Sequence, residues 1–416
     1  MEPKYRGLMQ KLFLQVEKPG LEFSYYQLLK EITSAKSFIP HLKTTSLTQF
    51  YINLLIGLAS GEQVVLIDPD FSESEIEKLL GSMDLLHQQK AAEVKADSIE
   101  QLLSSIETNG GTLTLFTSGT TGLPKKVTHT VNNFIRGVRR SDAHSDNVWA
   151  LAYNPTHMAG LQVFFQALYN LNPIINIFSK TRADVFKAIE SYGITHLSAT
   201  PTFFRMLLPA DTSFRNVRRI TFGGEKSDTN LHDKIRVLFP KAHVNNIYAS
   251  TEAGAILTAR NDEFEIKKEV IGKVEIRDKE IVVHSSLIGS STDLEVVDGW
   301  YHTNDIVEIT TTDPLRFKII SRGNELINVG GYKVNPNEVE ESMMMIDGIK
   351  DCRVFGKPNS VLGTILCAEF VLENGANITG KDIKKHLTSE LQNFKIPLII
   401  TSVEHLELTR TGKLKR

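Results

Sequence analysis

Short runs of β-branched and apolar residues recur along the first 250 residues, separated by stretches with helical periodicity. Five runs have the length and composition of buried strands: "QVVLID" (63–68), "TLTLF" (112–116), "VWALAY" (148–153), "PIINIF" (173–178) and "RRITFGG" (218–224). Helix-like stretches lie between them, at 72–83 and 182–193. In the first of these, apolar residues recur at helical spacing, at Ile76, Leu79, Leu80 and Met83. This alternation predicts an α/β core on a mainly parallel sheet.

The pattern changes from about residue 263. The stretches 273–286 and 316–321 read as short strands around turn residues, as an antiparallel appendage would. The last hundred residues then follow the order helix, strand, strand, helix, in "VNPNEVEESMMMI", "CRVFGKP", "ILCAEFVL" and "GKDIKKHLTSEL". This order predicts a separate small α+β domain.

Composition describes a globular chain without an obvious macromolecular partner. The 416 residues exceed one ordinary core, and 41% hydrophobic and 23% charged residues suit a soluble protein. A net charge of −2 gives no basic field for nucleic acid or membrane binding. The only cysteines, Cys352 and Cys367, have no zinc or redox spacing and fit a reducing compartment. No signal peptide or membrane-length apolar run is seen, so we expect a cytoplasmic protein.

The stretch "LFTSGTTGLPKKVTHT" (115–130) gathers hydroxyl side chains, glycines and a lysine pair after the strand-like run at 112–116. Because a helix-like segment (132–141) follows, its backbone N–H groups could converge on an anion between strand and helix. It is not a Walker A loop, since Leu123 and Pro124 separate the second glycine from Lys125. Composition alone leaves two interpretations, a hydrophilic surface loop or a cradle for phosphate.

The string "TSGTTGLPK" closely resembles the phosphate-binding motif of the adenylate-forming superfamily, which contains acyl- and aryl-CoA synthetases, adenylation domains and luciferases. The resemblance implies an ATP-binding fold with a large N-terminal domain and a small mobile C-terminal domain. It assigns phosphate contacts to Thr117, Ser118, Gly119, Thr120, Thr121, Gly122 and Lys125. Thr117 would also lie near a bound metal ion.

Further family motifs follow in order. "NPTHMAG" (154–160) resembles the segment with an acyl-pocket histidine, here His157, and "FGGEKSD" (222–228) resembles the segment that borders adenine. The latter implicates Gly223, Gly224 and Glu225. "YASTEAG" (248–254) resembles the aromatic and Thr-Glu signature. In it, Tyr248 would stack on adenine, with Ala249 and Ser250 following. Thr251 would bind phosphate and Glu252 would hold Mg²⁺.

Three later segments complete the resemblance. Asp305, in "WYHTNDI" (300–306), would accept the ribose hydroxyls, and Arg322 would contact ribose and phosphate. "LTRTGKLKR" (408–416) makes Lys413 the candidate catalytic lysine, although composition alone reads it as a frayed basic tail. We therefore expect an AMP-binding domain over 1–320, a hinge at 321–322 and a C-terminal lid over 323–416. Weaker matches lie at 23–29 and 58–71.

The implied reaction has two steps. ATP first converts a carboxylic acid into an acyl-adenylate, which needs Mg²⁺, a lysine and oriented N–H groups but no general base, because the acid is already ionised. A thiol, most simply that of CoA, then attacks the acyl-adenylate. In the family the C-terminal domain rotates between the steps, which would move Lys413 out and bring Gly330 and Gly331 toward the pantetheine arm.

Some positions depart from the family pattern. Lys126 and Asn304 replace common glycines, Ser321 replaces a charged hinge residue, and the stretch between 254 and 300 is compact. None of these changes removes a residue with a direct chemical role.

The acid is the least constrained part of the prediction. An Asp that holds the ammonium group in amino-acid-activating domains is absent from 154–160, which disfavours an amino acid. The His-Met-Ala-Gly-Leu run and the short chain look most like o-succinylbenzoate–CoA ligases of menaquinone synthesis. Phe164, Phe203 and Phe204 are candidates for an apolar acyl pocket or for plain core positions. Two alternatives stay open: a stand-alone enzyme that loads a separate acyl carrier protein, and a nucleotide-binding pseudoenzyme.

Overall fold

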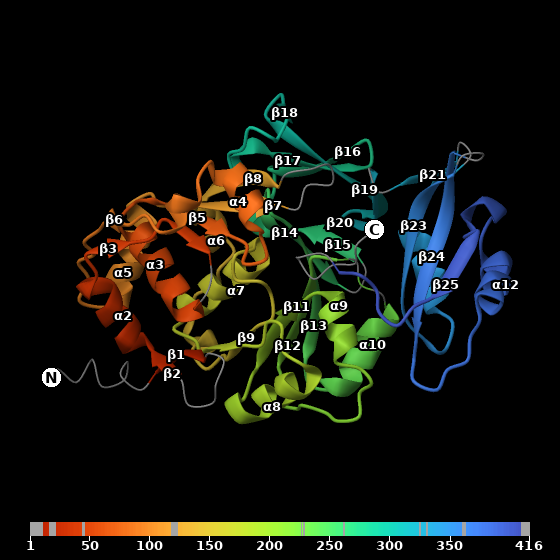
Figure 1. Ribbon diagram of the computed structural model, residues 1–416, viewed down its shortest axis with the longest axis horizontal. Coiled ribbons are helices and arrows are strands. Elements are labelled where there is room, and N and C mark those ends of the chain that lie inside the picture. The colour runs from red at the N-terminus through yellow and green to blue at the C-terminus, as the bar shows by residue number, and fades with distance from the viewer. Residues whose placement is uncertain are drawn as a thin grey trace.

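The computed structural model describes residues 11–15, 22–43, 46–117, 124–225, 227, 229–260, 263–323, 326–329, 332–359 and 363–408. Figure 1 shows a large body of mixed sheets and helices, with a smaller C-terminal domain beside it. The predicted α/β class with a small C-terminal α+β domain is therefore confirmed. Within the described ranges, no helix is both long and apolar enough to cross a membrane.

One large sheet carries most of the molecule, and its central part is parallel. Its parallel strands run in the order β1 (Leu12–Gln15), β10 (Ile174–Asn176), β9 (Trp149–Leu151), β11 (His196–Ala199), β12 (Arg219–Gly223) and β13 (His243–Ser250). The short antiparallel strand β2 (Glu22–Ser24) closes the edge beside β1. The three predicted strands of this region, at 148–153, 173–178 and 218–224, are thus present, each shorter than its apolar run.

The other half of the sheet is antiparallel, as the texture after residue 263 predicts. From β13 it continues through β14 (Gly254–Arg260), β15 (Glu263–Ile266), β20 (Leu315–Arg322), β19 (Trp300–Thr312), β17 (Glu280–His284) and β16 (Val274–Arg277), and β18 (Val296–Val297) pairs with β19. The β19–β20 hairpin sets Asp305 directly opposite Arg322. Two predicted nucleotide-binding residues therefore meet by strand register.

A second sheet contains β4 (His41–Lys43), β5 (Gln63–Ile67), β7 (Thr112–Thr117) and β8 (Lys125–Thr130). Strands β4, β5 and β7 are parallel, and β8 returns antiparallel to β7. The short pair β3 (Ser37–Phe38) and β6 (Lys90–Ala91) lies apart from it in the hydrogen-bonding pattern. Strand β8 corrects the sequence interpretation, which placed a helix directly after the phosphate loop. Val127 and His129 are buried while Lys125, Lys126 and Thr130 are exposed, the alternation of a strand.

Helices cover the sheets and enclose the apolar cores. A first group packs between the two sheets and beside them: α2 (Tyr25–Ser34), α3 (Leu47–Ala59), α5 (Ile99–Thr108), α6 (Val131–Ile135) and α7 (Met158–Leu168). A second group, α8 (Arg182–Tyr192), α9 (Pro201–Met206) and α10 (Thr229–Leu238), packs on the large sheet. Helix α4 (Glu73–Leu80) packs separately on β5 of the second sheet. Helix α4 begins with a capping box between Ser72 and Glu75 and ends at Gly81, whose φ is 82°. It therefore stops before Met83.

The C-terminal domain has its own core. It contains β21 (Ile327–Val329), β22 (Tyr332–Val334), α11 (Pro336–Met344), β23 (Ile349–Asn359), β24 (Gly363–Leu372), α12 (Gly380–Glu390) and β25 (Ile399–Ser402). The sequence pattern missed β25, whose residues are largely exposed. Two ion pairs join this domain to the helices of the larger body: Arg205 to Asp351 at 3.9 Å and Lys234 to Glu373 at 3.2 Å. Figure 1 shows α10 on the side of the body that faces this domain.

Candidate active site

Four of the predicted segments lie at one edge of the large sheet. Strands β9, β11, β12 and β13 are parallel neighbours, so their carboxyl ends meet at the same edge. The segment 154–157 follows β9, 200–202 follows β11, 223–225 lies at the end of β12, and 251–252 follows β13. Clefts at the carboxyl ends of parallel strands are the usual ligand sites of α/β sheets. The fold thus brings together segments that are about 100 residues apart in sequence.

Asp305 joins two other predicted residues in a closed cluster. Its carboxylate is buried, with only 5% of the residue exposed, and accepts a hydrogen bond from the Tyr248 hydroxyl at 2.5 Å. The Arg322 guanidinium donates to both carboxylate oxygens, at 3.0 and 3.2 Å. Such bidentate pairs are strong and directional. Tyr248, Asp305 and Arg322 therefore form one polar anchor at the end of β13.

The anchor also shifts the pKa values of Tyr248 and Arg322. Burial, followed by the charge of Asp305, raises the pKa of Tyr248 well above its ordinary value. Burial by itself lowers the pKa of Arg322, but the hydrogen bond and charge of Asp305 outweigh it and raise that pKa. Tyr248 is therefore a neutral donor and Arg322 a permanent cation at physiological pH.

The turn that carries Thr251 and Glu252 is held through its backbone. His129 Nε2 donates to the Thr251 carbonyl at 2.7 Å, and the Gly289 N–H donates to the Glu252 carbonyl at 2.9 Å. Arg136 donates to the Ala253 carbonyl. Because the contacts use carbonyl groups, the Thr251 hydroxyl and the Glu252 carboxylate remain side chains for a ligand. Ser250 Oγ accepts from the Ala253 N–H at 3.1 Å, which closes the turn from within.

His129 and Arg136 are supporting residues that sequence reasoning missed. Asn133 Nδ2 donates to His129 Nδ1 at 3.0 Å, so the imidazole is neutral and carries its proton on Nε2. A β-carbon on Gly289 would lie 2.6 Å from His129 Cε1, which shows how closely the chain packs over the ring. The signal in the sequence was a histidine at an inward position of an alternating strand.

The buried imidazole predicts a loss of stability in mild acid. Burial lowers the pKa of His129 to about 4; the bond to Thr251 opposes this shift and Arg136 adds to it. The unfolded chain binds a proton near pH 6.5, whereas the folded chain does not. The free energy of unfolding should therefore fall between pH 7 and pH 4, by about 3 kcal/mol for this group.

Melting temperatures measured between pH 7.5 and 4.5 check this expectation. His196, whose pKa burial also lowers to about 4, contributes a similar slope, so His129→Gln should flatten the curve only in part. His243→Gln, at an exposed position, is the matched control and should keep the wild-type slope. A His129→Gln curve parallel to the wild type would contradict the assignment.

The predicted phosphate loop connects two antiparallel strands. Thr117 pairs with Lys125 as the last pair of the β7–β8 ladder, so the loop is the tip of a hairpin. Ser118, Gly119, Thr120, Thr121 and Gly122 lie outside the described residues, and nothing further follows for them. Lys125 Nζ contacts the Asp293 carbonyl at 3.5 Å, and the Lys126 N–H contacts the Asp293 carboxylate at 3.4 Å. Lys126 thus lies on the exposed face of β8, where a side chain is tolerated.

His157 lies at the start of α7 and contacts a residue that the sequence did not single out. Its Nε2 lies 2.8 Å from Asp68 Oδ2, and Asp68 follows β5 of the second sheet. A β-carbon on Gly160 would lie 2.3 Å from the Asn154 carbonyl oxygen, so only glycine lets the "NPTHMAG" segment fold back on α7. This close approach fixes the backbone that carries His157.

The predicted adenine border has a second, structural function. Gly224 has a φ of 83°, a conformation that suits glycine. The Glu225 carboxylate accepts hydrogen bonds from the backbone N–H and the hydroxyl of Thr202, at 3.0 and 2.8 Å. Thr202 lies in the first turn of α9, so Glu225 caps this helix. The Glu225 side chain thus binds α9, and the backbone at 223–224 lies at the carboxyl end of β12.

Two of the three acyl-pocket candidates are core residues. Phe164 is fully buried and stacks on Tyr51 with ring centroids 4.2 Å apart. Phe204 is fully buried and packs on Phe222 at 4.5 Å. Both rings fill the layer between helices and sheet, so the core alternative holds for Phe164 and Phe204. Phe203, half-buried on the neighbouring face of α9, keeps the acyl-pocket prediction.

Of the remaining predicted residues, the structure describes Ser321 but not Lys413, Gly330 or Gly331. Ser321 is buried at the end of β20, and Asn335 Nδ2 donates to the Ile320 carbonyl at 3.0 Å beside it. Lys413, Gly330 and Gly331 lie outside the described residues. The side chain of Thr117 is likewise not described.

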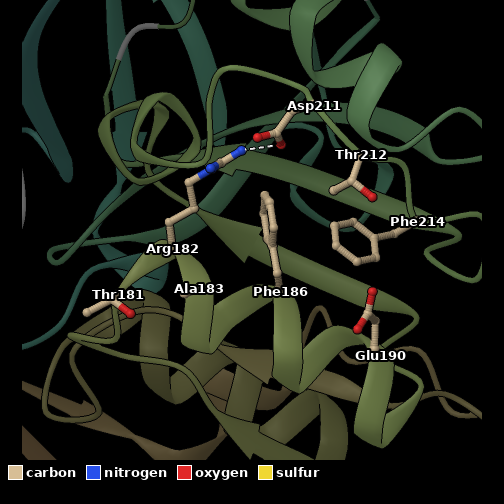
Figure 2. A pocket seen from close by; sticks show the side chains of 8 residues that line it. All are labelled: Thr181, Arg182, Ala183, Phe186, Glu190, Asp211, Thr212 and Phe214. Atoms are coloured by element: carbon tan, nitrogen blue, oxygen red, sulfur yellow. Dashed lines mark hydrogen bonds and ion pairs between the residues drawn. The ribbon is translucent and has the colours of Figure 1, made fainter.

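A surface hollow elsewhere contains none of the predicted residues. It lies between α8 and the 211–214 segment, and Figure 2 shows Arg182 pointing toward Asp211 beside the rings of Phe186 and Phe214. Arg182 pairs with Asp211, donates to the Leu207 carbonyl at 2.9 Å and lies 4.6 Å over the Phe186 ring. The guanidinium is therefore used to hold the chain after α9, and the hollow has no catalytic group.

Comparison with known proteins identifies the family of the chain. The AMP-binding enzyme model matches residues 59–285, and the AMP-binding enzyme C-terminal domain model matches residues 338–413. The chain belongs to the AMP-binding enzyme family. Its relatives include the 2-succinylbenzoate–CoA ligase of Staphylococcus epidermidis, 28% identical over 327 residues, which are 73% of this chain and 68% of that protein. The 2-succinylbenzoate–CoA ligase of Listeria monocytogenes is 25% identical over 76% of this chain and 71% of that protein.

Solved structures share the fold along nearly the whole chain. The O-succinylbenzoate Coenzyme A synthetase of Bacillus subtilis in complex with AMP superposes with a TM-score of 0.74, at 18% identity, over 99% of this chain and 95% of that chain. ATP-bound MatB of Rhodopseudomonas palustris gives a TM-score of 0.75, at 17% identity, over 97% and 94%. The architecture is that of adenylate-forming enzymes.

Proposed function

We propose that the protein is an ATP-dependent, AMP-forming acid–thiol ligase that joins an aryl or acyl carboxylic acid to CoA. The observation that carries the proposal is the Tyr248–Asp305–Arg322 anchor. Its member Tyr248 lies near the end of β13, three residues before Thr251 of the Thr251–Glu252 turn. A buried carboxylate flanked by a hydroxyl donor and a guanidinium suits a ribose diol and its phosphate. Membership of the AMP-binding enzyme family supports this use.

Mg²⁺ suits the donor set that the turn provides. The backbone carbonyl of Glu252 accepts a hydrogen bond from the Gly289 N–H, and its side chain supplies a carboxylate. Mg²⁺ typically takes one or two carboxylates together with phosphate oxygens and water. When bound, the ion would neutralise charge that develops on the phosphates. The related Bacillus subtilis synthetase has been solved with ATP and magnesium ion.

In the proposed reaction each group has a defined task. The hairpin tip at 117–125 holds the β- and γ-phosphates, Asp305 and Arg322 hold the ribose, and Lys413 lies beside the α-phosphate. The acid carboxylate attacks that phosphorus and pyrophosphate leaves. A thiol then attacks the acyl carbon and AMP leaves. We place the domain boundary at 321–322, so that rotation there exchanges Lys413 for Gly330 and Gly331 between the two steps.

The acid we favour is 2-succinylbenzoate or another aryl acid. Relatives of this chain from Staphylococcus epidermidis and Listeria monocytogenes carry the name 2-succinylbenzoate–CoA ligase, and a 26% identical relative from Vanilla planifolia is a 4-coumarate–CoA ligase. CoA is the favoured thiol for the same reason. Cys352 and Cys367 form no disulfide, which supports a reducing, cytoplasmic setting.

Acid-dependent release of pyrophosphate tests the proposal. We expect purified protein with ATP and Mg²⁺ to release pyrophosphate at least about tenfold above background with 2-succinylbenzoate or a related aryl acid, and to form a CoA thioester. Benzoate, octanoate and an amino acid complete the panel. Release without any dependence on acid, or no release at all, would overturn the reaction. A thioester formed only with a holo-carrier protein would replace CoA by that acceptor.

A further inference from the structure

Asp68 is a buried carboxylate that the mechanism above leaves without a task. Only 5% of the residue is exposed, and it follows β5 at the carboxyl end of the second sheet. Its partner His157 follows β9 at the carboxyl end of the large sheet, 89 residues further along the chain. Buried carboxylates are costly unless they are paired, so this contact across two sheets needs an explanation.

Backbone contacts hold both side chains in place. Asp68 Oδ1 accepts from the Asp70 N–H at 3.0 Å, which leaves Oδ2 for the imidazole. On the other side, the His157 N–H donates to the Asn154 carbonyl at 3.1 Å, and the close approach of Gly160 fixes the same turn. The pair is therefore set by its surroundings rather than formed by chance between mobile side chains.

The geometry separates the two ring nitrogens of His157. Nε2 faces Asp68 at 2.8 Å and carries a proton toward it, whereas Nδ1 has no hydrogen-bond partner among the described residues. The histidine side chain keeps 20% of its surface exposed, against 6% for Asp68. A carboxylate that binds one nitrogen of an imidazole makes the other a better proton acceptor, as in catalytic triads.

We propose that Asp68 and His157 form a carboxylate–imidazole pair that takes the proton of the attacking thiol in the second step. This inference rests on the proposed ligase function. The thiol sulfur forms a bond to the acyl carbon, the bond from that carbon to the AMP phosphate oxygen breaks with its electrons on AMP, and the thiol proton goes to His157 Nδ1. His157 is the base, and Asp68 is a positioning residue that stabilises the resulting imidazolium.

A base is useful in the thioester-forming step only, because only the thiol has a proton to lose. The acid substrate is already ionised at pH 7, but a thiol with a pKa of roughly 8.5 is mostly protonated there. Among the residues that the structure describes, α7 carries no charged side chain, Asp70 lies two residues after Asp68, and Lys43 on the neighbouring strand donates from Nζ to the Phe71 carbonyl.

The two half-reactions, measured separately, test the pair. Asp68→Asn keeps the shape and removes the charge; we expect thioester formation from supplied acyl-adenylate and CoA to fall about tenfold or more at pH 7. His157→Gln should lower it by about 100-fold. Acid-dependent pyrophosphate exchange should stay within about threefold for Asp68→Asn, which lies outside the predicted ATP and acyl motifs. Asp146→Asn, at an exposed ion pair before β9, is the matched control and should change neither step.

The pH profile separates a base from a structural support. As pH rises toward 9 the thiol ionises by itself, so the deficit of both variants should shrink. A deficit of constant size from pH 6.5 to 9, or equal losses in both half-reactions, would overturn the pair's role. Wild-type rates in both variants would overturn it as well, and would point to the AMP phosphate as the proton acceptor. The ligase function itself fails separately, if wild-type protein shows no acid-dependent exchange.

Discussion

Replacing Lys413 by alanine is expected to slow adenylate formation by about 10²–10³-fold while thioester formation from supplied acyl-adenylate stays near the wild-type rate. The physical reason is the distribution of charge. Negative charge accumulates on the α-phosphate only in the first transition state, and an ammonium group stabilises it there. In the second step the lysine is expected to have left the site with the rotating domain. Pyrophosphate exchange and single-turnover thioester formation give the two rates.

The tail supplies its own control for this experiment. Lys415→Ala removes the same charge two residues further on and should leave both rates within about twofold, because screening weakens a charge that is displaced from the reacting phosphate. Equal loss of both steps in Lys413→Ala would refute its separate role. Equal effects of Lys413→Ala and Lys415→Ala would mean that both lysines contribute only general positive charge.

Replacing Asp305 by alanine is expected to raise the KM for ATP by about 10- to 100-fold. The carboxylate accepts three hydrogen bonds, one from Tyr248 and two from Arg322, and hydrogen bonds to a charged group contribute about 1.5–3 kcal/mol. Alanine would remove the ribose contact and leave the guanidinium without its counter-ion. Steady-state kinetics with varied ATP measure the effect, and Glu308→Gln, exposed on the same strand, is the control.

A nucleotide analogue makes the assignment of Asp305 to ribose specific. Wild-type protein should prefer ATP over 2′-deoxy-ATP, and Asp305→Ala should lose most of that preference, since the variant has no carboxylate to receive the missing hydroxyl. If the preference persisted in the variant, Asp305 would support the fold of the hairpin rather than bind the sugar.

Sequence patterns predicted the fold where periodicity was clean. The parallel strands at 148–153, 173–178 and 218–224 were found because short apolar runs stand between polar turns. Strand β8 was read as part of the loop, since its two exposed lysines continue the polar composition of the preceding motif and only Val127 and His129 reveal the alternation. Strand β25 was missed because it lies at a sheet edge and has almost no buried residue.

In the candidate site, the sequence predicted the residues that belong to motifs and missed a contact that depends on the fold. Motif resemblance named Tyr248, Asp305 and Arg322, and the structure brings these three together. It could not name Asp68, because the partnership with His157 depends on how two sheets meet and leaves no local signature. The sequence left Phe164 and Phe204 between an acyl pocket and the core, since an aromatic ring in a core layer and one in a pocket look alike in sequence, and the structure places both in the core.

Helix α9 is only six residues long, and its two ends have different attachments. Glu225, next to the predicted adenine border, holds its first turn, while Arg205 near its last turn pairs with Asp351 of the C-terminal domain. So short a helix moves as a rigid piece and absorbs little displacement along its length. We therefore expect a shift of the chain at 223–225 to reach the Arg205–Asp351 contact with the C-terminal domain through this one helix.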